Sequence, residues 1–197
     1  MLWLGNDSAG EVAFSRALKI DPARRTTLRF MALLRLLQHA YPQALRWADS
    51  AVAIDSTFLQ AYVDRARAHR LLGDTAGARR DADVVQRFAT AGTKRWAEVA
   101  RVVADAAAGD TLAARARADR LYQEMVARDS TSPRLVFRES LYLAIALAVA
   151  GELDHALSTL EHARRWGLLL GGQLRAPEFD AIRDQPRFQR LVEELKP

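Results

Sequence analysis

The chain has 197 residues, of which 50% are hydrophobic and 27% charged, with 10 Gly and 6 Pro. This globular composition excludes a disordered or collagen-like chain, and the length suffices to bury a core without covalent staples. The absence of Cys excludes disulfides, thiolate metal sites and a cysteine nucleophile. Ala and Leu dominate and no strand-like alternation occurs, so the sequence predicts an all-α fold.

The chain is basic, with 29 Lys and Arg against 24 Asp and Glu and a net charge of +5. That charge, spread along the sequence without a block of consecutive cations, steers anionic partners only weakly. The N-terminus lacks the charged lead of a signal peptide. The most apolar run, Leu141 to Gly151, is shorter than the roughly twenty residues of a membrane span. We therefore expect no span in this segment.

Internal repetition is the strongest pattern in the sequence. The similar segments Ala17–Asp21 and Ala51–Asp55 are 34 positions apart. His39 follows Gly5 by the same interval, and Gly73 follows His39 by another 34. A fixed period of 34 residues made of two helices is typical of the tetratricopeptide repeat.

The chain resembles the tetratricopeptide repeat family along nearly all its length. The second half of a first copy is followed by four further copies, and a repeat region over 1–167 precedes a linker and capping helix over 168–197. In the fourth copy the turn arrives two residues late, and its second helix extends to about Asp129. The resemblance implies an α-α superhelix of about four helix pairs plus a C-terminal capping helix. It rests on Gly10, Phe14, Ala17, Pro22, Met31, Ala32, Ala44, Ala48, Tyr62, Ala66, Ala78, Ala82, Trp96, Val99, Ala100, Leu143, Ala144, Ala156, Leu160 and Ala163.

The turns between helices carry stop and start residues. Gly permits a left-handed residue at the end of a helix, and a following Asp or Thr can cap the next helix. We expect this arrangement in three turns, with Asp as the capping residue in each: Gly73-Asp74, Gly109-Asp110 and Gly151 with Asp154.

The C-terminal residues predict a cap on the last repeat. Phe179, Ile182, Phe188, Leu191 and Leu195 can cover the repeat while Arg and Glu face water. The run from Asp184 to Leu191 is similar to the ends of tetratricopeptide regions in bacterial signalling proteins, which include serine/threonine protein kinases, adenylate cyclases and transcriptional regulators. Because the repeats begin in mid-copy, we expect a piece of a larger signalling protein. It would be cytoplasmic as a bare fragment, or either the cytoplasmic or the extracytoplasmic part of the larger protein.

The sequence favours a non-catalytic protein. His155 and His162 lie two helical turns apart without a third ligand, and no His-Glu-x-x-His, nucleophile-elbow or phosphate-loop motif occurs. The acid pairs, of which Asp81 and Asp83 are one, are expected to be solvated charge on helix faces. We expect no enzyme activity, no metal and no cofactor.

The expected function is protein–protein interaction in the concave groove, which the first helix of each family repeat lines. The partner would be a peptide or helix, with acidic character, or an upstream domain of the same protein. Six of ten inward positions are cationic, which predicts a basic stripe along the groove. The planar guanidinium groups of its Arg residues can bind carboxylate or phosphate through two hydrogen bonds each. Two alternatives stay open, RNA binding through an Arg-rich face and self-association at the N-terminal edge. The ten positions are Arg29, Leu33, Gln60, Asp64, Arg67, Arg70, Lys94, Arg101, Arg138 and Tyr142.

Overall fold

The computed structural model describes residues 7–129, 140–165, 167 and 171–195. All regular elements in these ranges are helices, which confirms the all-α prediction. In chain order they are α1 Asp7–Ile20, α2 Arg25–Leu37, α3 Tyr41–Ile54, α4 Leu59–Leu71, α5 Thr75–Phe88, α6 Lys94–Ala107, α7 Thr111–Asp129, α8 Ser140–Val149, α9 Leu153–Arg165, the 3₁₀ helices η3 Gly171–Arg175 and η4 Pro177–Ile182, and α10 Pro186–Glu194.

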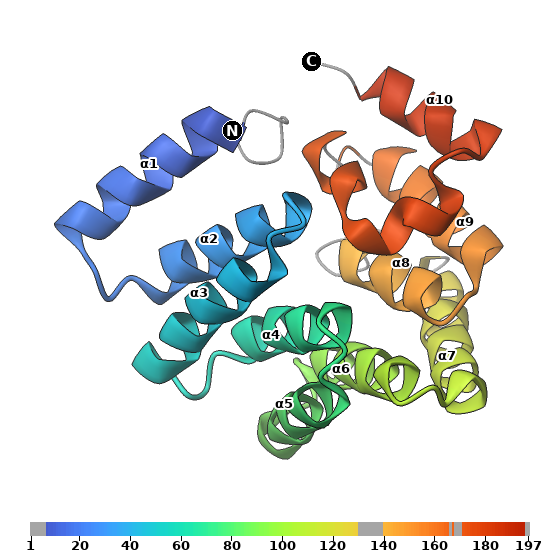
Figure 1. The fold of residues 1–197 in the computed structure, drawn as a ribbon. Coiled ribbons are helices and arrows are strands. Elements are labelled where there is room, and N and C mark those ends of the chain that lie inside the picture. Colours follow the sequence, from blue (N-terminus) through green and yellow to red (C-terminus); the bar gives the residue numbers. More distant parts are fainter. Residues whose placement is uncertain (1–6, 130–139, 166, 168–170, 196–197) are drawn as a thin grey trace.

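The helices stack as neighbouring pairs along a curved row (Figure 1). Each helix packs on the next in sequence, and α2, α4, α6 and α8 also pack side by side. These four form an inner layer, while α3, α5, α7 and α9 lie outside it (Figure 1). The row curves far enough that α1 and α10 both lie at the same end of the view (Figure 1).

The helix starts show how far the repeat period holds. The outer helices α1, α3 and α5 begin at residues 7, 41 and 75, which are 34 apart as predicted. Helix α7 begins 36 residues after α5, and α9 begins 42 residues after α7. The extension of α7 to Asp129, expected from the irregular fourth copy, is also confirmed. The fold is therefore a regular repeat in its first half and a distorted one in its second.

The turn after each of the four inner helices contains a residue with positive φ. Gly73, Gly109 and Gly151 have φ values of +76°, +75° and +82°, the left-handed conformation expected after a helix. His39, which precedes Gly73 by 34 positions, is also left-handed, with φ of +58°. Equivalent positions in two copies thus share a conformation although only one of them is glycine.

The expected Asp caps are confirmed in two turns and wrong in the third. Asp74 accepts a hydrogen bond from the Gly77 amide at 2.8 Å, and Asp110 accepts one from the Ala113 amide at 3.0 Å. Asp154 lies inside the first turn of α9, which begins one residue earlier. Its carboxylate can interact favourably with the positive end of the helix dipole there, but within the described part of the chain it accepts no hydrogen bond from a backbone amide.

The left-handed turns predict opposite effects of two substitutions. Gly73→Ala places a Cβ where φ is +76°, and we expect it to lower the free energy of unfolding by about 1 kcal/mol. His39→Gly relieves the same strain and loses an exposed hydrogen bond and a ring contact between His39 and Tyr41, so we expect stability to be kept or to rise. Urea unfolding of both variants checks this. Equal losses in the two variants would contradict the assignment of His39 to the glycine position.

The C-terminal segment is more than a single capping helix. The predicted core residues Phe179, Ile182, Phe188 and Leu191 are buried, whereas Leu195 is partly exposed. The segment breaks into η4 and α10 because Pro186 begins a new helix at its first position. The preceding η3 reaches across to α1, where Arg175 donates to Asp7 at 2.9 and 2.5 Å. The last part of the described chain therefore joins the first.

Candidate interaction site

A buried network of charged side chains lies at the centre of the inner layer. Hydrogen bonds join Arg29 from α2, Asp64 and Arg67 from α4, and Tyr142 from α8, and Arg67 connects this cluster to Glu178 of η4. The first helices of three different repeats thus converge on one cluster, and the C-terminal segment supplies the fifth member. We call these five residues the central network.

Asp64 is the hub of the central network. Its carboxylate accepts hydrogen bonds from Arg29 Nε at 2.7 Å, from the Tyr142 hydroxyl at 2.8 Å and from an Arg67 guanidinium nitrogen at 3.1 Å. Arg29 also donates to the Tyr142 hydroxyl. On its other side, Arg67 donates through Nε and a terminal nitrogen to the two oxygens of Glu178, at 2.8 and 3.0 Å. This bidentate geometry is the strongest form of an Arg–carboxylate pair.

The central network is almost fully removed from water. Asp64, Arg67, Tyr142 and Glu178 are buried, and Arg67 has 2% of its surface exposed. Burial opposes the charge on Glu178, but the charge and hydrogen bonds of Arg67 outweigh it and hold the pKa of Glu178 below its usual 4.5. Burial raises the pKa of Tyr142, so the hydroxyl stays protonated as the donor to Asp64. Two cations and two anions face one another, so the network carries no net charge.

The lowered pKa of Glu178 predicts loss of stability in acid. The folded protein binds this proton more weakly than the unfolded chain, so the contribution is complete above pH 4.5 and is lost as pH falls through the folded value. The pKa values of Asp7, Glu11 and Glu161 are also lowered, chiefly by hydrogen bonds from Arg175, Arg35 and Arg187, and act in the same direction. We expect the free energy of unfolding to fall as the pH drops below about 5.

Urea unfolding as a function of pH checks this, with Glu178→Gln as the comparison. The variant is less stable at neutral pH, and its stability should fall less steeply with acid because one of the contributing carboxylates is gone. Equal pH slopes for both proteins would show that Glu178 is not ionised and paired in the folded chain.

The structure brings together four of the ten residues predicted for the groove, namely Arg29, Asp64, Arg67 and Tyr142. The inner-face prediction for α2, α4 and α8 therefore placed side chains that do meet. The cations among them are paired with acids inside the fold. Of the remaining six, Leu33 lies in the core, Gln60 is half-buried, Arg70 is half-buried and interacts electrostatically with Glu178, Lys94 is exposed, Arg101 pairs with Asp83 at 2.7 Å, and Arg138 lies outside the described residues.

In the fourth repeat, the residue that contacts the inner layer differs from the predicted ones. Trp96 of α6 packs edge-on against Tyr142, with ring centroids 4.7 Å apart, next to the central network. The predicted positions Lys94 and Arg101 make no such contact, and Arg101 turns toward Asp83 on α5. The late turn after α6 signalled that this copy departs from the regular register. Trp96 is partly buried and also packs against the hydrophobic core.

A second buried ion pair corrects the expectation for Asp81. We expected a solvated carboxylate, but Asp81 of α5 is 1% exposed and accepts three hydrogen bonds from Arg65 of α4, at 2.5 to 3.1 Å. Burial raises the pKa of Asp81 against the opposing charge of Arg65. Arg65 reaches Asp49 of α3 at 3.0 Å as well. These acids therefore link helices.

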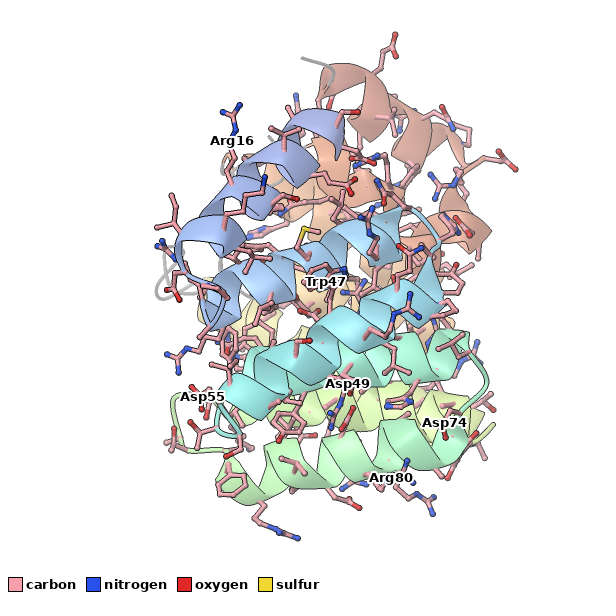
Figure 2. The ribbon with its side chains drawn as sticks, turned by 60° about the vertical axis from the view of Figure 1, so that its left-hand side comes forward. Arg16, Trp47, Asp49, Asp55, Asp74 and Arg80 are labelled. Atoms are coloured by element: carbon pink, nitrogen blue, oxygen red, sulfur yellow. The ribbon has the colours of Figure 1, made fainter. Side chains whose placement is uncertain are left out.

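A row of exposed apolar side chains follows the repeat period on the outer helices. Ile20, Ile54 and Phe88 are the last residues of α1, α3 and α5, spaced 34 apart, and they are 87%, 51% and 48% exposed. The C-terminal ends of these helices follow one another along one edge of the molecule in both views (Figures 1 and 2). Asp55, labelled in Figure 2, directly follows Ile54. We call Ile20, Ile54 and Phe88 the apolar row.

Exposed cations border the apolar row. Lys19 and Arg87 precede Ile20 and Phe88 in sequence, and Arg24 lies in the turn after α1. None of the three forms a hydrogen bond or ion pair through its side chain with the described part of the chain. Ile20 and Ile54 lie in the matched segments Ala17–Asp21 and Ala51–Asp55, which serve in the sequence as markers of the repeat. Predicting the exposure of these side chains requires knowing that each is the last residue of its helix.

Comparison of the chain with protein-family models, with curated proteins and with solved structures found no match. Among the described residues, no helix has the length and apolar character needed to cross a membrane. The same residues contain no group of three or more His, Asp or Glu placed to hold a metal ion.

Proposed function

We propose that the chain is a non-catalytic protein–protein interaction module, built as a tetratricopeptide-like helical repeat. The single observation that carries this proposal is the apolar row. Isolated exposed apolar residues are ordinary on protein surfaces, but three at equivalent positions of successive repeats form an extended contact line. A partner that packs along this line contacts all the regular repeats at once. The signalling-protein context suggested by the run from Asp184 to Leu191 stays a prediction.

The partner would be a protein segment with apolar side chains and acidic neighbours. Apolar side chains match Ile20, Ile54 and Phe88, while carboxylates match the unpaired charges of Lys19 and Arg87. Such charge matching raises the rate of encounter and selects among partners more than it adds affinity. The acidic character expected of a groove partner is thus kept, but at a different surface.

The outer position is favoured because the inner face is already filled. Arg67 and Asp64 are satisfied by residues of the chain itself, and a groove partner would have to displace η4. Displacing η4 would expose Phe179 and Ile182, each fully buried. Losing that burial costs about 1.5–3 kcal/mol per side chain. Binding in the groove therefore requires a partner that replaces both the carboxylate of Glu178 and its apolar neighbours.

Nucleic-acid binding remains the second candidate because exposed Arg residues occur on the outer helices, with Arg79 and Arg80 on α5 as examples. Figure 2 shows Arg80 on the surface, away from the apolar row. Single-strand binding also needs exposed aromatics on which bases stack. Phe88 is the one such side chain among the exposed large hydrophobic residues described. The protein partner is therefore better supported.

A capture experiment with a surface variant tests the proposal. The full chain is immobilised and exposed to lysate of its source, beside the triple variant Ile20→Gln/Ile54→Gln/Phe88→Gln. The control is Leu72→Gln/Leu112→Gln, because these residues are 41% and 81% exposed but lie outside the row. Each capture is repeated after nuclease treatment, and bound proteins are crosslinked and mapped by mass spectrometry.

We expect a nuclease-resistant protein that the wild type and the control capture and the triple variant loses, crosslinked through an apolar segment with acidic neighbours. Equal capture by the triple variant would refute the apolar row as the binding surface. Capture that disappears after nuclease treatment would favour the nucleic-acid alternative. Circular dichroism of the variants shows whether their fold is intact.

A further inference from the structure

A cleft of about 310 Å³ lies between α9 and α10. Its residues are distant in sequence from the apolar row. Four arginines, two glutamates and one leucine line it, so the lining carries a net charge of +2. The lining residues are Glu161, Arg164, Arg165, Arg187, Arg190, Leu191 and Glu194. Leu191, which is buried, is the apolar residue of this lining.

Two of the four arginines are held by carboxylates. Arg187 of α10 donates to both oxygens of Glu161 of α9, at 2.9 and 2.7 Å, and also to Ser158 at 3.1 Å. Arg164 of α9 pairs with Glu194 of α10 at 2.8 Å. Both pairs cross from one helix to the other and fix the two walls of the cleft.

The other two arginines have no such partner. Arg165 of α9 and Arg190 of α10 form neither a hydrogen bond nor an ion pair with the described residues, although both charges help to lower the pKa of Glu161. The C-terminal helix dipole accounts for a cation at Arg165, the last residue of α9. It does not account for Arg190, which lies in the middle of α10. The two free guanidinium groups therefore face a shared cleft from opposite walls.

We propose that this cleft binds a phosphate monoester. A phosphate carries close to two negative charges at neutral pH, which matches the net charge of the lining. Its three terminal oxygens can accept hydrogen bonds from Arg165 and Arg190 together, whereas a single carboxylate pairs with only one guanidinium group. Arg187 and Arg164, held by Glu161 and Glu194, shape the site and add a favourable field.

A titration of the full chain with inorganic phosphate tests the proposal, at constant ionic strength maintained with chloride. Amide chemical shifts in a two-dimensional NMR spectrum report where the ion binds. We expect saturable shifts confined to α9 and α10, and binding at least about tenfold weaker in Arg165→Gln/Arg190→Gln. The matched control is Arg79→Gln/Arg80→Gln on α5, which removes the same charge outside the cleft and should bind normally.

Shifts that do not saturate, or that are equal in both double variants, would overturn the proposal. Arg190→Gln alone is a second variant should the double variant fold poorly. Two further ligands separate the sources of the phosphate. A phosphoserine peptide that binds more tightly than inorganic phosphate, while the unphosphorylated peptide does not bind, assigns the site to a modified protein. Equal affinity of the phosphopeptide and inorganic phosphate assigns it to a small molecule.

Discussion

Arg67→Met is expected to lower the free energy of unfolding by about 3–5 kcal/mol, because it removes one side of a buried ion pair. Arg67 is 2% exposed and holds Glu178 through two hydrogen bonds and Asp64 through a third. Without it, Glu178 is left as a buried carboxylate without its bidentate partner, whereas Asp64 keeps Arg29 and Tyr142. Urea unfolding at neutral pH measures the loss.

Two further variants isolate the pair from the loss of side-chain packing. Arg67→Met/Glu178→Gln removes the unpaired charge, so we expect it to be more stable than Arg67→Met alone. Arg70→Met is the matched control, since Arg70 lies one helical turn further along α4. Burial lowers the pKa of Arg70, which means that the fold does not favour the charge at this position. We expect its cost to stay under about 1 kcal/mol. Similar losses for Arg67→Met and Arg70→Met would mean that the central network adds little to stability.

The sequence predicted the regular half of the fold because local chemistry repeats there. The 34-residue interval from His39 to Gly73 marks two turns that share a left-handed residue, and the helices that follow these turns, α3 and α5, also begin 34 residues apart. Turn chemistry is local, so a few residues determine it. Asp154 shows the limit, because α9 begins two residues earlier than a cap at Asp154 requires, which makes this residue part of the first turn.

The central network could be predicted only in part, because its pairs join distant segments. The family register placed Arg29, Asp64 and Tyr142 on inner faces, and these side chains do meet. It gave no sign of Glu178, which is 111 positions from Arg67 and comes from the segment assigned to linker and cap. The spacing of apolar residues along the helices is the same whether the groove is open or is filled by the C-terminal segment of the chain. The balance of charge in the groove therefore depends on the tertiary path of the last residues.

Phe179→Ala is the second large effect, with an expected loss of about 3–5 kcal/mol in the free energy of unfolding. Phe179 is fully buried in η4 and packs against Phe188 of α10, with ring centroids 6.1 Å apart. Its removal leaves a cavity under the segment that carries Glu178. Phe88→Ala is the matched control, because that ring is 48% exposed, and we expect a loss of under about 1 kcal/mol.

The size of the Phe179→Ala loss also decides between two roles of η4. If η4 is part of the core, its amides exchange with solvent only when the whole chain unfolds, and Phe179→Ala lowers global stability by the full amount. If η4 instead opens on its own, the global loss is small and the amides of residues 177–182 exchange far faster than those of α4. That second result would make the central network accessible and return the partner site to the inner face. The burial of Phe179, Ile182 and Glu178 leads us to expect the first result.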